Sequence, residues 1–251
     1  LEMRIMEGPQ ATINKVRING NDRLYENIVR RELRTKPGDL FNKDALERSY
    51  REIAQMGHFN PENIQPDVQP DATNGTVDIN WNLESKPNDQ IEFSAGWGQT
   101  GVIGKLSLKF TNFSMSNLFR KNDNYRGIIP QGDGQTLTVS GQTNGSYYQS
   151  YSISFLDPWF GGKRPNSLSV SAFYSVQTDI SSNYYNSAYM NNFYNYYSGY
   201  GSYYNNYYNN YESYYDPDKS IKMYGFALGW GKRLRWPDDY FTLSVQLAYQ
   251  R

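Results

Sequence analysis

The sequence predicts a small α+β domain followed by the first part of an antiparallel transmembrane β-barrel. Apolar residues at helical spacing are confined to the first third of the 251 residues. From residue 88 onward, segments of about ten residues alternate apolar and polar side chains instead. No apolar run approaches the roughly 18 residues that a transmembrane helix needs. We therefore expect an α+β domain over 11–87 and about seven N-terminal barrel strands over 88–251.

The composition excludes several kinds of chemistry. The chain has 25 basic and 25 acidic side chains, no cysteine and one histidine. It therefore offers no disulfide, no thiol nucleophile, no thiolate metal site and no histidine cluster. It also lacks the excess positive charge that holds nucleic acid without sequence preference. His58 follows Gly57 at a predicted helix end, where a packed or capping role is more common than catalysis. We expect no cofactor and no metal site.

The first third is predicted to have the element order β-α-α-β-β. The first strand ends in an Asn-Gly turn, and the helix after it is expected to be capped by Asn21 or Asp22. Asn42 is the expected cap of the second helix, which carries one apolar stripe and ends at Gly57. The predicted elements are strand 11–20, helix 22–34, helix 43–57 and strands 63–69 and 76–85.

Seven alternating segments follow the α+β domain. In each segment apolar side chains occupy one face, while serine, threonine, glycine and a few charged residues occupy the other. The apolar faces are Ile91, Phe93, Ala95 and Trp97; Leu106, Leu108 and Phe110; Leu137 and Val139; Tyr151, Ile153 and Phe155; Leu168, Val170, Ala172, Tyr174 and Val176; Tyr224, Phe226, Leu228 and Trp230; and Phe241, Leu243, Val245, Leu247 and Tyr249.

Two architectures use strands of this kind. In a soluble sandwich the apolar face meets another sheet, whereas in an outer-membrane barrel it meets lipid. Strands of about ten residues favour the barrel, because globular strands are typically about five or six residues long. Aromatic residues near strand ends are also typical of the interfacial girdles of a barrel. A secreted β-sandwich remains the alternative. The predicted girdle residues are Trp97, Trp159, Phe160, Trp230, Trp236 and Tyr240.

Basic residues are confined to alternate connections between the predicted strands. The links after the first, third and fifth strands carry none. Because alternate loops of a meander lie on opposite sides of a membrane, the basic side is the side of the α+β domain, where it would meet anionic headgroups or a soluble partner. The basic residues are Arg120, Lys121 and Arg126 after the second strand, Lys163 and Arg164 after the fourth, and Lys232, Arg233 and Arg235 after the sixth.

The α+β segment resembles a known family of domains. INKVRINGNDRLYENIVRRELRTKPGDLFNKDALERSYREIAQMGHFNPENIQPDVQP, followed by GTVDINWNLESKP, is similar to a polypeptide-transport-associated (POTRA) domain. Residues 1–10, with the pair Glu7-Gly8, resemble the last strand of a preceding copy. TNFSMSNLF and DPWFGGKRPNSL resemble the first barrel strands of the BamA family of outer-membrane assembly factors, most closely its Bacteroidetes branch.

The resemblance implies a function and a set of partners. Members of the family lie in the outer membrane, where they fold other β-barrel proteins and insert them into the lipid bilayer. Their periplasmic POTRA domains receive unfolded β-barrel substrates and dock accessory lipoproteins. The resemblance implies no catalytic residue and therefore no enzyme. Seven strands cannot close the barrel of this family, so we expect a piece of a longer chain. The alternatives are a related POTRA-barrel translocator that exports one dedicated partner, and a porin or adhesive surface barrel.

Two strand edges are candidate binding sites for other strands. In the family the first barrel strand lines a seam that opens, and an open seam exposes unpaired backbone groups as a template. Gly96 and Gly98 would make opening easier, although they could also only relieve crowding or allow curvature. In the POTRA domain the exposed edge is expected at Ile64, Gln65, Asp67 and Val68, where Pro66 removes one donor. The seam residues are Gln90, Ile91, Glu92, Phe93, Ser94, Ala95, Gly96, Trp97 and Gly98.

The connection over 179–219 is a tyrosine- and asparagine-rich tract that the loop pattern places on the side away from the α+β domain, which in the family is the cell exterior. Its tyrosines follow steps of three and four, as one face of a helix does, although asparagine, serine and glycine form helices poorly. We expect either a low-complexity loop or an aromatic stripe that contacts an extracellular surface protein. The central residues of the stripe are Tyr196, Tyr197, Tyr200, Tyr203, Tyr204, Tyr207, Tyr208 and Tyr211.

Overall fold

The computed structural model describes residues 10–98, 101–119, 129–145, 147–178, 220–234, 236, 238 and 240–251. The chain divides into two compact units. The first unit contains residues 1–90 together with 109–137 and 155–165, and the second contains 91–108, 138–154 and 166–251. The first unit therefore combines the α+β domain with two segments from later in the chain.

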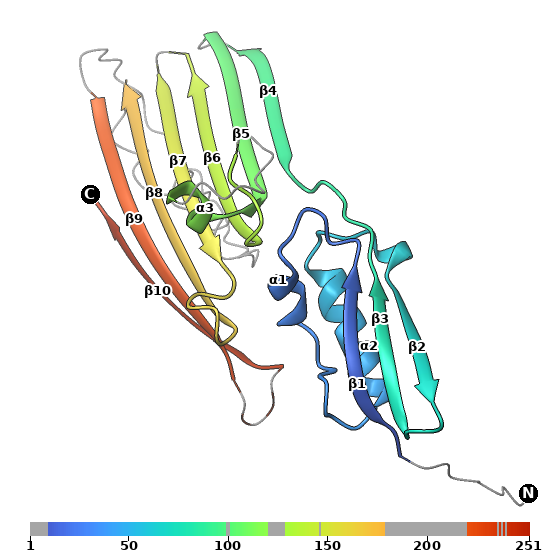
Figure 1. The fold of residues 1–251 in the computed structure, drawn as a ribbon. Helices are drawn as coiled ribbons and strands as arrows, with labels where there is room; N and C mark the ends of the chain where they lie inside the picture. Colours follow the sequence, from blue (N-terminus) through green and yellow to red (C-terminus); the bar gives the residue numbers. More distant parts are fainter. Residues whose placement is uncertain are drawn as a thin grey trace, which may run out of the picture. The chain divides into compact units, whose positions relative to one another are not determined.

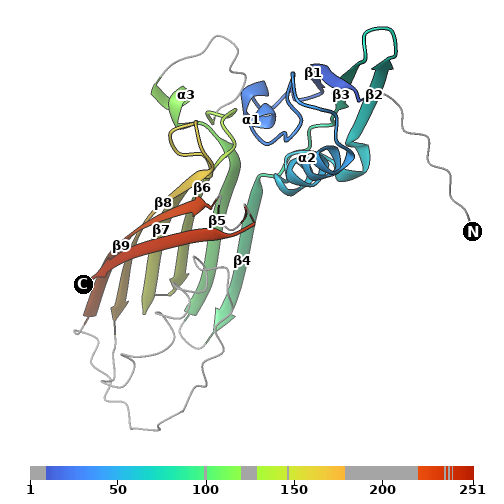
Figure 2. The same cartoon turned by 90° about the horizontal axis from the view of Figure 1, so that it is seen from below.

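The α+β domain has the predicted order β-α-α-β-β. Its three-stranded sheet has the order β1-β3-β2, in which β1 runs parallel and β2 antiparallel to the central β3. Helix α2 packs along one face of this sheet (Figure 1, Figure 2). The elements are β1 (Thr12–Asn19), α1 (Glu26–Arg30), α2 (Lys43–Gln55), a short 3-10 helix (Pro61–Asn63), β2 (Gln65–Asp71) and β3 (Thr76–Asn82).

The two helices differ in how well the sequence predicts them. Helix α2 begins as expected, because the side chain of Asn42 accepts a hydrogen bond from the Asp44 N–H at 2.8 Å. The first helix was expected over 22–34, yet α1 has only five residues, and neither Asn21 nor Asp22 caps it. The N–H of Tyr25 donates to the carbonyl of Gly132 at 3.0 Å. Tyr25 itself is extended, with φ −65° and ψ 140°, so the helix begins only after this residue.

The core of the α+β domain lies between the helices and the sheet. Alternate residues of β3 are fully or almost fully buried, as the period of two requires: Val77, Ile79 and Trp81. Ile53 of α2 packs into the same cluster. Truncating a buried aromatic such as Trp81 to alanine would cost about 3–5 kcal/mol. The core cluster consists of Ile13, Val16, Leu24, Ile28, Val29, Leu33, Ile53, Phe59, Ile64, Val77, Ile79, Trp81 and Leu83.

The second part of the chain forms a seven-stranded sheet in which every strand neighbours the next in sequence (Figure 1). The seven predicted strands are confirmed, and each has 9–14 residues. Lys232 and Arg233, expected in a connection, lie in the last residues of β9. The strands are β4 (Gln90–Gly98), β5 (Gly101–Phe113), β6 (Gln135–Asn144), β7 (Tyr148–Asp157), β8 (Asn166–Thr178), β9 (Ser220–Arg233) and β10 (Thr242–Gln250), with a short helix α3 (Met115–Phe119) after β5.

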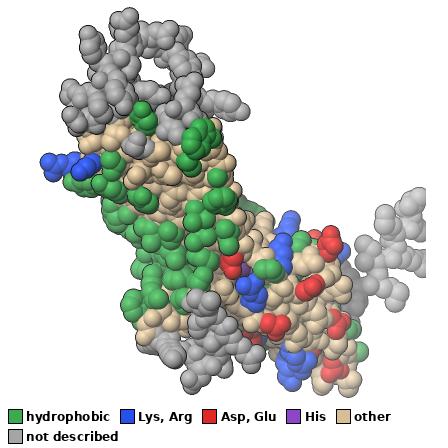
Figure 3. All heavy atoms as spheres, turned by 90° about the horizontal axis from the view of Figure 1, so that it is seen from above, with side chains coloured by type: hydrophobic (Ala, Val, Ile, Leu, Met, Phe, Trp, Pro, Cys, Tyr) green, Lys and Arg blue, Asp and Glu red, His purple; other side chains and the backbone are tan. Residues whose placement is uncertain are grey.

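The apolar face of the seven-stranded sheet is exposed. Figure 3 shows hydrophobic side chains gathered over its strands, and large residues such as Phe93 and Leu247 are 75% and 69% exposed. The opposite face contains buried small residues, among them Ser171, Ser175 and Ala227. This distribution is the reverse of a soluble sheet and is typical of strands that face lipid. The exposure of this apolar face favours the barrel over the sandwich alternative.

Glycines of β9 allow the side chains of β8 to lie over its backbone. Gly225 is paired with Phe173, and a Cβ atom added at Gly225 would lie 2.2 Å from the Phe173 ring. Gly229 and Gly231 face Ser169 and Ser167 in the same way, with the serine Oγ atoms 2.2 and 2.3 Å from an added Cβ. Larger residues at these positions of β9 would displace β8 side chains from the polar face.

Candidate functional site at the first strand of the sheet

The edge strand β4 is the predicted seam, and its bounds match the prediction. It ends the strand order, and none of the other described strands pairs with its free edge. Residues 90–97 are all exposed, and Trp97 is 83% exposed. A Cβ atom added at Gly96 would meet no atom within 4 Å. Crowding therefore does not require a glycine at position 96. What distinguishes Gly96 from other residues is the greater conformational freedom of its backbone.

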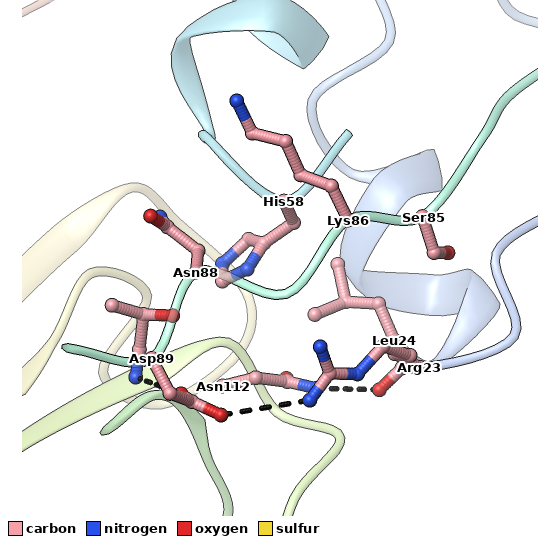
Figure 4. Close-up of a pocket in the computed structure, with 9 residues that line it drawn as sticks. Arg23, Leu24, His58, Ser85, Lys86, Asn88, Asp89 and Asn112 are labelled. Atoms are coloured by element: carbon pink, nitrogen blue, oxygen red, sulfur yellow. Dashed lines mark hydrogen bonds and ion pairs between the residues drawn. The ribbon is translucent and has the colours of Figure 1, made fainter. Parts of the chain in front are cut away.

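The residue before β4 connects three segments of the first unit. Asp89 accepts a hydrogen bond at 3.0 Å from the backbone N–H of Thr111, which lies near the end of β5. Its second carboxylate oxygen lies 3.5 Å from an Arg23 guanidinium nitrogen and 3.4 Å from the side-chain amide of Gln131. Figure 4 shows Arg23, Asp89 and Asn112 around one pocket. The start of β4 is therefore bound to the α+β domain and to β5 by one side chain.

Asn112 holds the same region together from the other side. Its amide group donates to the carbonyl oxygen of Arg23, and its amide oxygen accepts from the N–H groups of Gly132 at 3.2 Å and Gly134 at 3.1 Å. Asn112 is 5% exposed. Gly132 has a φ of +130°, and an added Cβ would lie 2.6 Å from the Tyr25 ring. The loop over 129–134 thus fits closely against the residues that precede α1.

His58 lines the pocket beside Asp89 and Arg23 (Figure 4). Burial lowers the pKa of His58 below its ordinary value of 6.5; the Asp89 carboxylate opposes this shift and the Arg23 guanidinium adds to it. The imidazole is therefore neutral at pH 7. A neutral histidine in a polar, hydrogen-bonded loop fits the predicted packed position.

A second contact connects the turn after β7 to the α+β domain within the first unit. The Arg31 guanidinium lies 4.9 Å from the centre of the Trp159 ring, and the indole N–H donates to the Glu32 carboxylate. Burial lowers the pKa of Arg31, while Glu32 raises it. Trp159 was expected in an interfacial girdle, and this placement corrects that expectation. Trp97, Phe160, Trp230, Trp236 and Tyr240 are exposed as expected.

The remaining predicted site residues are placed as follows. Gln65, Asp67 and Val68 lie in β2, which is an edge of its sheet. Ile64 precedes β2 and is buried in the core, so its side chain is not available at that edge. The stripe of tyrosines between Tyr196 and Tyr211 lies outside the described residues. No helix in the part of the chain that the structure describes is long and apolar enough to span a membrane.

Sequence reasoning missed Asp89, Arg23 and Asn112. These are single polar residues in loops or at a strand end, and Asn112 and Arg23 are 89 positions apart. No local pattern marks such a pair, because their contact depends on how the chain folds. Asp157 and Trp159 did carry a local signal, because an aspartate often accepts a hydrogen bond from the backbone N–H two residues later. Here the Asp157 carboxylate accepts from the Trp159 N–H at 2.9 Å.

Comparisons with known proteins agree with the geometry. Residues 11–86 match the POTRA family, described as a surface antigen variable number repeat. The chain is 29% identical over 160 residues to the outer membrane protein assembly factor BamA of Neisseria meningitidis, covering 63% of this chain. It is 25% identical over 162 residues, 64% of this chain, to a putative outer membrane protein assembly factor of Treponema pallidum. In each case it spans 18% of the relative's length.

A solved structure has a similar fold. The crystal structure of BamA from Haemophilus ducreyi lacking POTRA domains 1–3 aligns with 96% of this chain and 49% of its own chain. The TM-score is 0.54 and the sequence identity is 17%. This likeness concerns the fold: a POTRA domain followed by antiparallel strands of a barrel.

Proposed function

Since this chain joins a POTRA domain to the first strands of a BamA-type outer-membrane barrel, we propose that it belongs to a factor that folds β-barrel proteins and inserts them into the outer membrane. The two relatives described above, from Neisseria meningitidis and Treponema pallidum, carry assembly in their names, which favours this function over a translocator for one dedicated partner. A POTRA domain joined directly to the first strand also disfavours a plain porin or adhesive barrel. The bilayer and unfolded β-barrel proteins are the proposed partners.

The observation that carries this proposal is the position of β4 as the first strand of the sheet, directly after the POTRA domain. If the edge of β4 opposite β5 opens in the assembled barrel, its N–H and C=O groups are a template on which an incoming strand could form a ladder. Its apolar residues Ile91, Phe93 and Trp97 are exposed on the same face as those of the neighbouring strands. An added strand with the same alternation would therefore continue the lipid-facing surface. We propose that β4 is the seam strand on which a substrate barrel begins to pair.

The test is to stiffen the seam strand in the full-length protein. Gly96→Val combined with Gly98→Val should slow the insertion of a model β-barrel substrate into vesicles, because valine restricts the backbone and favours continuous strand pairing. The variant should itself remain folded and inserted. Gly104→Val in β5 is the matched control, since an added Cβ there makes an ordinary contact of 3.6 Å with Thr143. Unchanged insertion by the β4 variant would refute the seam.

For the POTRA domain we propose docking through side chains instead of strand addition. The β2 edge supports this proposal. Successive residues of a strand direct their N–H groups to opposite sides, so Pro66, Val68 and Pro70 share one side. Because β2 pairs with β3 over its whole length and proline has no N–H, this side is inferred to be the open edge. An added strand would find only the Val68 N–H there.

The β1 edge is already occupied by the domain itself. The N–H of Ile13 donates to the backbone carbonyl of Asp39 at 2.8 Å, and the carbonyl of Ile13 accepts from the N–H of Gly38 at 2.7 Å. Further along, the Arg30 guanidinium donates two hydrogen bonds of 3.2 Å to the carbonyl of Val16. Neither edge of this sheet offers a continuous row of free backbone groups. Substrates and accessory lipoproteins are therefore proposed to bind through surface side chains of the domain.

A further inference from the structure

We propose that Asp89 is a positioning residue that fastens the first end of β4, so that movement of the seam strand is confined to the end that carries Gly96 and Gly98. This inference rests on the seam function proposed above. The Asp89 side chain keeps the first end of β4 in one place and one register, while the far end of the strand opens.

The first step is the set of contacts that Asp89 makes. Its carboxylate accepts from the Thr111 N–H at 3.0 Å and lies within 3.5 Å of Arg23 and 3.4 Å of Gln131. These partners come from β5, from the loop before α1 and from the loop before β6. A carboxylate that accepts from a backbone N–H makes a stronger bond than a neutral acceptor does. The chain is thus bound from three directions immediately before β4 begins.

The second step is that the partners of Asp89 are themselves fixed. Thr111 is 7% exposed, and its neighbour Asn112 binds the Arg23 carbonyl and two backbone N–H groups of the 129–134 loop. Gln131 lies in that same loop, whose Gly132 fits against the Tyr25 ring. Asp89 is therefore attached to a packed framework and not to mobile surface side chains.

The third step is the contrast with the rest of the strand. Residues 91–97 are exposed, and the one side-chain contact described for them is the Glu92–Lys105 ion pair at 3.1 Å. Both of its side chains are more than two-fifths exposed, at 62% and 44%, so the pair stabilises little. Beyond Asp89 the strand is held chiefly by backbone pairing, and at Gly96 no side chain adds to that pairing.

The fourth step concerns register. A slip of β4 by two residues would keep its apolar side chains on the same face, so the alternation alone does not prevent it. Such a slip would move Asp89 by about 7 Å along the strand and separate it from Thr111, Arg23 and Gln131. Only two residues separate β4 from β5, so this short connection restricts the register at one end of β4. Asp89 fixes the same register at the other end, and an incoming strand would then meet its partners in one order only.

The experiment is hydrogen exchange on the full-length protein in lipid vesicles, followed by peptide mass spectrometry. Asp89→Ala should raise the exchange rate of the amides at 90–94 by about tenfold or more, because it removes a charge-assisted bond and two further contacts. The amides of the β8–β9 ladder should not change. Asp89→Asn keeps one acceptor oxygen and loses the charge, so it should give a smaller increase; it also serves if the alanine variant folds poorly.

Glu92→Gln is the matched control, since it removes the same charge three residues later from an exposed ion pair. It should leave the exchange of 90–94 unchanged. Equal exchange at 90–94 in wild type and both Asp89 variants would overturn the inference, as would a uniform rise across the whole sheet. Insertion of a model substrate is measured separately with the Gly96→Val, Gly98→Val variant. If hydrogen exchange changes as expected in the Asp89 variants while this glycine variant inserts substrate normally, the positioning role of Asp89 is supported and the proposed seam function fails.

Discussion

Replacing the two prolines of β2 should convert a protected edge into one that accepts a strand. Pro66→Thr with Pro70→Thr restores two backbone N–H donors on the side shared with Val68, and threonine suits a strand. Each additional backbone hydrogen bond contributes about 1 kcal/mol net, so two contribute about 2 kcal/mol. That free energy corresponds to about a thirtyfold gain in affinity for an extended peptide.

The assay is the fluorescence anisotropy of a labelled peptide of alternating valine and threonine, titrated with the detergent-solubilised protein. Sedimentation of the same samples would reveal self-association through the new edge. Pro61→Thr is the control, because Pro61 begins the 3-10 helix and lies outside the sheet. The reasoning is refuted if the double variant binds the peptide no more tightly than wild type and the Pro61 variant do. Tight binding by the wild type at β2 would refute it equally.

Three further predictions address other contacts. Trp159→Phe removes the indole donor to Glu32 and keeps an aromatic ring over Arg31. The free energy of local opening near Arg31, measured by hydrogen exchange, should therefore fall by about 1–2 kcal/mol. Trp159→Ala should lower it further, and equal effects of the two variants would contradict the contact between the ring and Arg31. The lowered pKa of His58 means that the unfolded domain binds more protons as the pH falls below about 6.5, so the urea midpoint should fall with acidification, and less so in His58→Gln. If the tyrosine stripe contacts an extracellular surface protein, deleting 183–215 should release that co-purifying protein while the barrel stays folded; release of nothing would favour a low-complexity loop.

The strands of the seven-stranded sheet can be predicted from the sequence because their pattern is local. Alternation with a period of two depends only on neighbours such as Phe93 and Ser94, and the lipid-facing side is visible in it directly. The second helix was equally predictable from Asn42 and one apolar stripe. The first helix was not, because Leu24 and Leu33 keep the helical spacing although they lie outside α1. Tyr25 is extended, and its N–H donates to the distant carbonyl of Gly132, which no periodic pattern marks.

The candidate site divides in the same way. The edge strand follows from its place as the first segment of a meander, so its residues could be named in advance. Asp89 could not, since a single aspartate at the start of a strand resembles any solvated loop residue. Trp159 shows the opposite error: its position near a strand end resembled an interfacial aromatic, whereas Arg31 and Glu32 bind it. In both cases a distant partner decided the role of the side chain.

The glycines of β9 have a mechanical consequence for the wall of the barrel. Along Gly225, Gly229 and Gly231 one strand contributes only backbone to the polar face, and the side chains of its neighbour fill the space above it. Sheets curl most sharply where glycine removes side-chain volume from the inner surface. We therefore expect the wall to curve most sharply at β9, between β8 and β10.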